Sequence, residues 1–412
     1  MQRKQWLNED WTAVFVAFLI IVINLGGFHP SLPALNWRGT DGLITIFAPD
    51  LFLTLTILWG FGLAMVTLGF ITKGDAVSLR MMGGYTLIFS IAVAAQLITG
   101  NREIKALGLE IVLFSLFIGL FISNLLKVPE WVRPVIQTEL YIKIGLVLLG
   151  TGIIFQEMMQ AGALGLIQSI VVVVVVWQVS FWICRKFGLD DELRAMLSSA
   201  VAICGVSAAI ATAGAIKGDS KKLSYVISLV LITAIPMMLI MPYIARSTGM
   251  SDAVAGAWLG GTIDTTGAVV AAGHVLGEEA LKYATVVKFS QNVLLGLAAF
   301  AISVYWAYTR NEKQERPSAR TIWDRFPKFV LGFIVASFVF SFLLSPHLVA
   351  GVKSPLKGLQ TFWFALAFTC IGLETKFNDI FSLENGRPAI AFLIAQSFNI
   401  LFTLIVALFV FG

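Results

Sequence analysis

The sequence predicts an all-α polytopic membrane protein, because the chain is strongly apolar and its hydrophobic runs are long and continuous. Of the 412 residues, 58% are hydrophobic and only 13% are charged, and the mean hydropathy is +0.86. Clear runs are Leu51–Thr72, Met81–Thr99, Ala163–Cys184 and Phe329–Leu344. We expect about 13 transmembrane helices, each near the roughly 20 residues that cross a bilayer. A membrane β-barrel would instead alternate apolar and polar residues.

The chain begins with two apolar runs that are separated by a loop from His29 to Asp50. Acidic Glu9 and Asp10 precede the first run, so we expect a retained membrane span and not a cleaved signal peptide. Asn311–Arg325 is a long charged stretch between spans and is typical of a cytoplasmic linker. The predicted segments are an additional N-terminal two-helix segment (1–80), the first part of the core (81–310), the linker (311–325) and a C-terminal repeat (326–412).

We attribute the net charge of +5 to basic loops on one side of the membrane and not to a nucleic-acid-binding surface. Cytoplasmic loops carry an excess of Lys and Arg, and the densest basic stretch runs from Arg310 to Lys328. Placing this stretch inside puts the N-terminus in the cytoplasm, although it also puts Lys217, Lys221 and Lys222 outside. We expect a multi-pass protein of the cell inner (plasma) membrane.

Two segments combine high apolarity with many glycines and small hydroxyl residues. The first is Ala200–Gly214, and it returns in altered form as Gly260–Gly273. Gly214 matches Gly273 at the same offset at which Gly218 matches Gly277, so the similarity extends beyond composition. Small residues let helices approach closely, and glycines let a helix break inside the membrane. The sequence therefore predicts two discontinuous helices whose free peptide groups line a transport site.

A fainter similarity relates the three spans from Leu109 to Cys184 to the three from Phe329 to Phe411. Gly150-Thr-Gly152 stands opposite Cys370-Ile-Gly372 in this comparison. An odd number of predicted spans separates the two triplets, so the copies would have opposite orientations. Inverted repeats of this kind are typical of secondary transporters.

The two Gly-rich segments also carry a family resemblance. Ile203-Cys-Gly205 followed by small residues, and Val269-Val-Ala-Ala-Gly-His274 farther along, resemble the YeiH-type sulfate exporter family of the cation:proton antiporter and anion transporter superfamily. The resemblance runs from about residue 81 to the C-terminus and implies a secondary transporter, often dimeric, with broken or crossing helices. Two features depart from the family pattern: Asp264-Thr-Thr-Gly-Ala268 replaces a His-Glu-Val-Ala-Gln sequence, and Gln291 replaces an arginine.

Asp264 and Lys288 are the charged residues for which we expect a functional role. Asp264 lies in the middle of its apolar segment, where a carboxylate costs about 2.5–3.5 kcal/mol unless it faces water, protein or a partner. It would bind H+ or Na+, or cap a helix end within the break. Lys288 would neutralise an anion or pair with Asp264, although snorkelling to the interface is the alternative.

Short hydroxyl residues and glycines complete the candidate site. Hydroxyls suit Na+ or oxyanion oxygens but also bond to their own backbone, and the glycines serve either as breaks or as close-packing positions. The candidate substrate-binding residues are Cys204, Gly205, Val206, Ser207, Gly261, Thr262, Thr265, Thr266, Gly267, Lys288, Gln291 and Asn292. The candidate ion-coupling residues are Asp264, Thr265 and Ser207.

These patterns predict a secondary active transporter of a small anion, coupled to Na+ or H+. Expected partners are a small inorganic or organic anion, the coupling ion, membrane lipids and a second copy of the chain, with no nucleic acid, catalytic residue, metal centre or cofactor beyond Na+. One alternative is a cation:proton antiporter in which Asp264 and Lys288 are the exchange pair. An intramembrane enzyme or a sensor is the alternative of another class, disfavoured because no catalytic pairing or soluble output domain is evident. The chain has no phosphate-binding Gly-Lys-Ser/Thr loop, which disfavours ATP-driven transport.

Overall fold

The structure, a computed structural model, describes residues 7–30, 32–33, 35–39, 47, 49–106, 111–126, 128–310, 323, 326–375 and 386–412. Within these ranges the regular elements are helices, and the β-pairing consists of an isolated bridge between Trp37 and Asn101. The predicted all-α class is confirmed.

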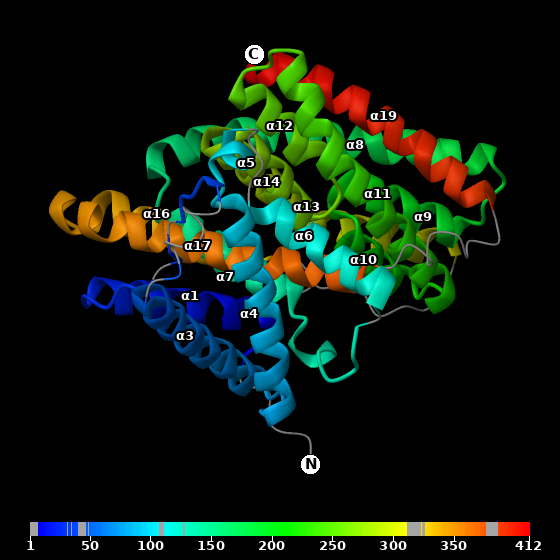
Figure 1. Cartoon of the computed structure of the whole chain (residues 1–412). Helices are drawn as coiled ribbons and strands as arrows, with labels where there is room; N and C mark the ends of the chain where they lie inside the picture. Colours follow the sequence, from blue (N-terminus) through cyan, green and yellow to red (C-terminus); the bar gives the residue numbers. More distant parts are fainter. Residues whose placement is uncertain are drawn as a thin grey trace. The chain divides into compact units, whose positions relative to one another are not determined.

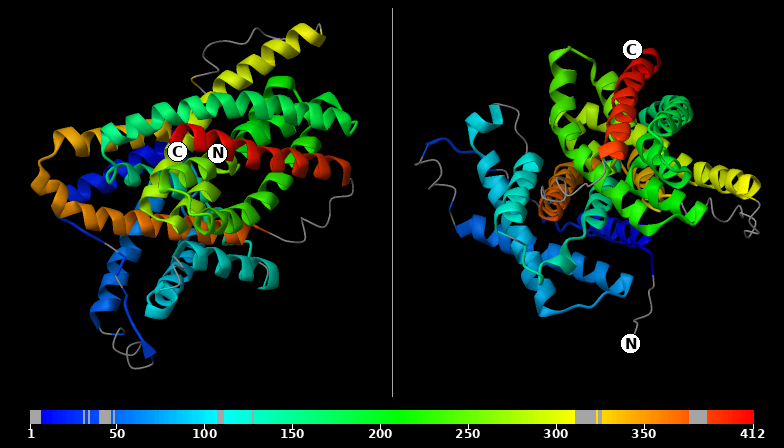
Figure 2. Two further views of the ribbon diagram at one scale, coloured as in Figure 1. Left: turned by 90° about the horizontal axis from the view of Figure 1, so that it is seen from above. Right: turned by 90° about the vertical axis from the view of Figure 1, so that its right-hand side faces the viewer.

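Seven of the described helices are long and apolar enough to cross a membrane. They are α3 (Pro49–Lys73), α4 (Leu79–Thr99), α8 (Phe155–Lys186), α11 (Ser220–Ser247), α14 (Glu278–Arg310), α17 (Pro346–Glu374) and α19 (Gly386–Phe411). Several, such as α8 and α19, are long unbroken rods (Figures 1 and 2). The described part of the chain also contains four shorter apolar helices. A polytopic membrane protein is supported, whereas the predicted number of about 13 spans is not confirmed.

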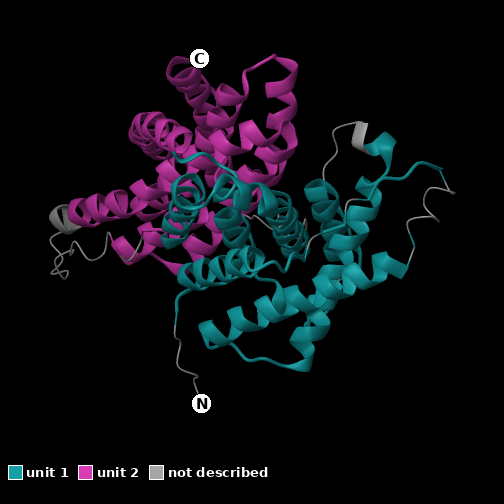
Figure 3. Cartoon of the chain, turned by 90° about the vertical axis from the view of Figure 1, so that its left-hand side faces the viewer, with its two compact units in different colours: residues 1–155, 328–376 teal, residues 156–327, 377–412 magenta. Residues whose placement is uncertain are grey.

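The helices divide into two compact units, coloured separately in Figure 3. Unit 1 comprises Met1–Phe155 and Lys328–Lys376, and unit 2 comprises Gln156–Pro327 and Phe377–Gly412. The predicted segments (1–80, 81–310, 311–325 and 326–412) were assigned by expected role and have other boundaries than the two units. This segmentation stays a prediction. Apart from Trp323, the predicted linker lies outside the described residues.

Unit 1 contains two helix pairs of similar build. Its further elements are α1 (Glu9–Leu25), α5 (Arg102–Ala106), α6 (Ile111–Phe121), η1 (Ile122–Leu126), η2 (Arg133–Val135), α7 (Thr138–Gly150), α16 (Lys328–Phe338) and η4 (Val339–Leu343). Both α6 and α16 have 11 residues and continue into a five-residue π-helix. The predicted triplets correspond to α6, α7 and α8 and to α16, α17 and α19. Helix α6 packs on α17, and α16 packs on α7, so the first helix of each triplet packs on the second helix of the other. The inverted relation of the triplets stays a prediction.

Glycines make these crossings close. A Cβ at Gly119 of α6 would lie 2.6 Å from the carbonyl oxygen of Thr369 in α17. A Cβ at Gly150 of α7 would lie 2.5 Å from the carbonyl oxygen of Phe333 in α16. Both distances are shorter than van der Waals contact, so only glycine fits these positions without moving a helix.

Ion pairs attach the N-terminal helix α1 to the rest of unit 1. The ammonium of Lys143 in α7 lies 2.6 Å from Glu9 and 3.0 Å from Asp10. Asp10 also accepts a hydrogen bond of 2.8 Å from the backbone N–H of Lys328, at the start of α16. The additional N-terminal helices are therefore an integral part of this unit.

Unit 2 contains both Gly-rich segments. Its short elements are α9 (Asp191–Ser199), η3 (Ala200–Cys204), α10 (Val206–Ile216), α12 (Asp252–Thr262) and α13 (Thr266–Leu276). Each Gly-rich segment forms a pair of short helices, and the long helix α11 connects one pair to the other. The long helices α8, α14 and α19 complete the unit.

Candidate functional site: two helical hairpins and a buried lysine

The first Gly-rich segment forms a helical hairpin, with α9 and η3 as one arm and α10 as the other. The arms pack against each other, and the chain reverses at Gly205. At the open end, Lys222, which follows α10, lies 2.8 Å from Asp190 and 3.2 Å from Glu192, at the start of α9. The arms are therefore antiparallel. The second arm has 11 residues and is about 16 Å long, about half of the roughly 30 Å hydrocarbon core. The predicted break is present, and it reverses the chain.

Acidic caps fix the open end of this hairpin. The Asp190 side chain accepts from the N–H of Leu193, and the Asp219 side chain accepts from those of Lys221 and Lys222. The hydrogen bonds from the backbone N–H groups of Lys222 and Lys221 lower the pKa of Asp219 below its usual value. Burial opposes ionisation of Asp190, but hydrogen bonds from Lys222 and the backbone outweigh it and lower the pKa of this carboxyl as well.

The second Gly-rich segment forms a second hairpin, from α12 and α13, with its turn at Ile263–Thr265. The two arms pack against each other and against α14. Gly256, early in α12, lies against Ala280, and Gly273, late in α13, lies against Leu281. Because both contacts are at the start of α14, the open end of the hairpin lies there and the arms are antiparallel.

The turns of the two hairpins touch. Gly205 has φ of 61° and ψ of −113°, a conformation that side chains disfavour. A Cβ on Gly205 would lie 3.0 Å from the Cβ of Asp264 in the other turn and 2.6 Å from Cγ1 of Val230 in α11. We call the contacting turns, Val201–Ser207 and Gly261–Gly267, the first tip and the second tip.

Lys288 of α14 connects the two tips. Its side chain is 1% exposed, and its ammonium donates to the carbonyl oxygens of Ile203 at 2.9 Å and Ile263 at 2.8 Å. The third donor goes to Oε1 of Gln291 at 2.9 Å. These carbonyls end the first arm of each hairpin, where the helix dipole is negative, so a cation there is stabilising. The alternative in which Lys288 snorkels to the membrane surface does not fit its burial.

Two carboxamides repeat this bridging pattern. Gln291 donates to Ala202 in the first tip at 2.9 Å and to Gly261 in the second at 3.2 Å. Asn399 of α19 donates to Val201 at 3.1 Å and to Thr262 at 3.2 Å. Three consecutive carbonyls in each tip thus receive hydrogen bonds from the same three side chains. This near-symmetric set satisfies backbone groups that apolar surroundings would leave costly.

Asp264 lies in the second tip beside this network. It is 1% exposed, and neither carboxylate oxygen accepts a hydrogen bond of standard geometry from the described residues. The neighbouring Lys288 ammonium and Gln396 amide both favour the ionised form of this carboxyl group. Buried carboxylate oxygens without hydrogen bonds of standard geometry are uncommon in proteins.

The second arms present their N-terminal ends near the same place. Helix α10 has no side-chain cap, and Ser207 in its first turn is exposed. Helix α13 is capped by Thr265, whose hydroxyl accepts from the N–H of Ala268 at 3.3 Å, and Thr265 and Thr266 are half-buried. The first N–H groups of an α-helix have no partner within the helix and favour an anion.

The structure places all the predicted site residues in the tips or on the adjoining face of α14. Cys204, Gly205, Val206 and Ser207 lie in the first tip, Gly261, Thr262, Asp264, Thr265, Thr266 and Gly267 lie in the second, and Lys288, Gln291 and Asn292 lie on α14. The sequence interpretation did not include Gln396 and Asn399 of α19. Their signal was the spacing of two amides three residues apart in an apolar run, which puts them on one helix face.

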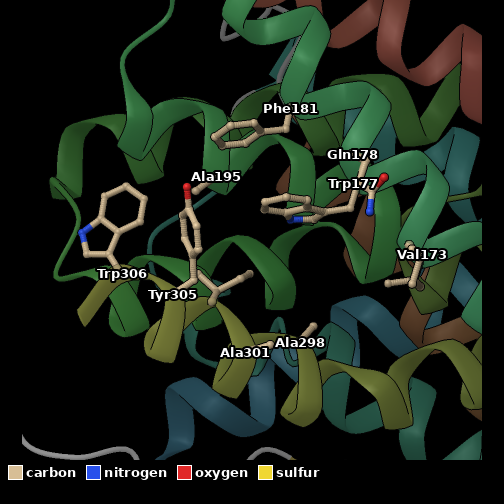
Figure 4. A pocket seen from close by; sticks show the side chains of 11 residues that line it. Val173, Trp177, Gln178, Phe181, Ala195, Ala298, Ala301, Tyr305 and Trp306 are labelled. Carbon is tan, nitrogen blue, oxygen red and sulfur yellow. The ribbon is translucent and has the colours of Figure 1, made fainter. Parts of the chain in front are cut away.

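A separate pocket in unit 2 has a different character (Figure 4). It has a volume of about 420 Å³ and is lined by aromatic residues of α8 and α14, including Trp177, Phe181, Tyr305 and Trp306. Its lining contains no charged side chain, so it does not suit an ion. It therefore differs from the tips, where Asp264 and Lys288 are buried.

Comparison with known proteins gives consistent matches. A family model described as "Conserved hypothetical protein 698" matches residues 83–391. A UPF0324 membrane protein of Rhodopirellula baltica is 40% identical over 341 residues, which cover 80% of this chain and 63% of the relative. One of Nitratidesulfovibrio vulgaris is 37% identical over 364 residues, which cover 82% of this chain and 62% of the relative. The chain spans about three fifths of the length of these relatives. No solved structure matches.

Proposed function

The chain belongs to the YeiH-like family of UPF0324 membrane proteins, and from this premise we propose that it is a secondary active transporter of a small anion. The anion is sulfate, a sulfonate or a similar species, and its movement is coupled to Na+ or H+ by alternating access. The protein acts in the cell inner (plasma) membrane with its N-terminus in the cytoplasm, as a homodimer, and it carries out no catalysis.

The observation that supports this proposal best is the meeting of two hairpin tips at buried Lys288 and Asp264. Polar backbone at membrane depth is tolerated where it is buried in protein or lines a solute path. Half-helix ends that face each other near the middle of the membrane are typical of the binding sites of secondary transporters.

The anion would bind at the N-terminal ends of α10 and α13. The positive dipole ends of these helices favour a tetrahedral oxyanion, and the hydroxyls of Ser207, Thr265 and Thr266 can donate to its oxygens. Lys288 supplies a buried positive charge nearby. Because its three donors are engaged with Ile203, Ile263 and Gln291, direct contact with the anion requires it to release one of them.

Asp264 would couple the anion to a cation. An ionised Asp264 repels an anion at the neighbouring helix ends, and a bound H+ or Na+ removes this repulsion. The two ligands therefore bind cooperatively, which is what coupling requires.

A cation:proton antiporter is the second candidate, favoured by the burial of Asp264 and Lys288 beside each other. It predicts cation exchange against protons without any anion. The two candidates differ in their dependence on sulfate or another oxyanion.

Uptake into proteoliposomes tests the proposal. Radiolabelled sulfate and a small sulfonate are offered under imposed Na+ or H+ gradients, and we expect gradient-dependent accumulation. Asp264→Asn should abolish the dependence on the gradient, whereas the matched variant Asp252→Asn, at the exposed start of α12, should behave like the unmodified protein. Cation exchange without uptake of any tested anion would support the antiporter instead. Full gradient-coupled uptake by Asp264→Asn would remove Asp264 from the mechanism.

A further inference from the structure

Several buried oxygen atoms in the second tip and on the helices that pack against it have no hydrogen bond of standard geometry from the described residues. Besides both carboxylate oxygens of Asp264, these are Oε1 of Gln396, Oδ1 of Asn292 and the hydroxyl oxygen of Thr262. The exposed fractions of these four residues are 1%, 3%, 6% and 1% respectively. More than nine in ten buried polar groups in proteins are hydrogen-bonded, so this concentration points to a ligand.

The nitrogen atoms of both carboxamides have partners in the second tip. Nε2 of Gln396 donates to the carbonyl oxygen of Thr262 at 3.1 Å, and Nδ2 of Asn292 donates to the hydroxyl of Thr266 at 3.2 Å. Rotating Gln396 would break its bond to Thr262, because a carbonyl oxygen only accepts, whereas Asn292 can keep a bond to Thr266 in either orientation, because a hydroxyl both donates and accepts. In the orientation that the structure has, the oxygens are the ends without a partner.

The number and charge of these atoms discriminate between ligands. A proton on Asp264 satisfies one acceptor and leaves the amide oxygens of Gln396 and Asn292 without a donor. A metal ion with oxygen ligands satisfies them all. The set contains one carboxylate and lies beside the Lys288 ammonium, so its net charge suits a monovalent ion better than a divalent one.

We propose that the second tip binds Na+ through the Asp264 carboxylate, the amide oxygens of Gln396 and Asn292 and the hydroxyl of Thr262. Taking this Na+ as the coupling ion rests on the proposed transport function. The two tips then have different tasks, because the first contains no acidic residue and has an uncapped helix start with exposed Ser207. Na+ completes the second tip and neutralises Asp264, and the anion binds at the helix N-termini.

Equilibrium binding of radiolabelled Na+ to the purified full chain in detergent tests this assignment. Choline chloride keeps the ionic strength constant, and K+ serves as the competitor. We expect saturable binding of one Na+ per chain that K+ displaces poorly. Asp264→Asn should abolish this binding, and Asn292→Ala should weaken it by about tenfold through loss of one ligand.

Ser397→Ala is the matched control. Ser397 neighbours Gln396 on α19, but it is exposed and its hydroxyl donates to the carbonyl oxygen of Leu393 in the same helix at 2.8 Å, so it is not a ligand and its variant should keep the unmodified affinity. Thermal melting without Na+ verifies that each variant is folded. Absence of saturable binding to the unmodified protein, or equal binding by Asp264→Asn, would overturn the assignment.

The outcomes separate this inference from the proposed function. Saturable Na+ binding together with no anion uptake under any gradient would support the Na+ site and refute the anion transporter. Uptake driven by a proton gradient, without Na+ binding, would refute the Na+ site and support the transporter.

Discussion

The contact between the two hairpin tips can be perturbed most directly at Gly205. In Gly205→Ala, the new methyl group would lie 2.6 Å from Cγ1 of Val230 and 3.0 Å from the Cβ of Asp264. The backbone at this position, with φ of 61° and ψ of −113°, is also one that alanine disfavours. Two independent penalties therefore act on one substitution.

Their magnitudes follow from the geometry. A non-glycine residue in a sparsely populated backbone region costs about 1–3 kcal/mol. Overpacking of a tight interior adds about 1–3 kcal/mol, because both neighbours are anchored in packed segments. We expect Gly205→Ala to lower the free energy of unfolding by about 2–6 kcal/mol, the sum of the two terms.

Equilibrium unfolding in mixed micelles measures this loss, and a double-mutant cycle divides it. Val230→Ala removes the closer atom, so the cost of Gly205→Ala should be about 1–3 kcal/mol smaller in the Val230→Ala background, where the backbone penalty and the approach to Asp264 remain. Gly60→Ala, in helix α3 with nothing within 4 Å of the new methyl group, is the control and should be neutral or slightly stabilising. An unchanged free energy of unfolding for Gly205→Ala in both backgrounds would refute the close packing of Gly205 against α11 and the second tip.

Three further predictions concern other parts of the molecule. Lys288→Met should destabilise the protein by about 2–6 kcal/mol in the same assay, because two buried carbonyls lose their donor at about 1–3 kcal/mol each; Lys221→Met, on the exposed side of α11, should have no effect. Gly119→Ala should separate α6 from α17 and lower the melting temperature, since the methyl group would meet a backbone oxygen at 2.6 Å. The lowered pKa of Asp219 makes its contribution to stability complete above the pKa of the unfolded chain, near about 4, and lost as the pH falls through the folded value. The difference in melting temperature between the unmodified protein and Asp219→Ala should therefore shrink below about pH 4, and a constant difference would contradict it.

The position of the candidate site could be predicted from the sequence because its chemistry is concentrated in short segments. A buried acid, a buried base and two Gly-rich runs are rare in apolar helices, and each costs stability unless it has a partner. For this reason Asp264, Lys288 and the tip glycines were identified together. Gln396 and Asn399 were not, because amides commonly join neighbouring membrane helices and nothing in α19 indicates which backbone they contact.

The path of the chain through each break could not be predicted from local pattern. A glycine permits both a kink and a reversal, and the choice depends on tertiary contacts. Here the contacts are those of Lys222 with Asp190 at the open end and those of Gly256 and Gly273 with the start of α14. These partners are separated by many residues in the sequence, so no local period reveals them.

The reversal changes how the internal similarity of the chain is understood. Helix α11 has 28 residues and is about 42 Å long, enough for one crossing. The first hairpin opens at its N-terminal end, where Lys222 contacts Asp190, and the second opens at its C-terminal end, where Arg246 donates to the carbonyl oxygen of Val275 at 2.8 Å. The open ends of the two similar hairpins therefore lie at opposite ends of α11, so the stronger of the two sequence similarities relates segments of opposite orientation.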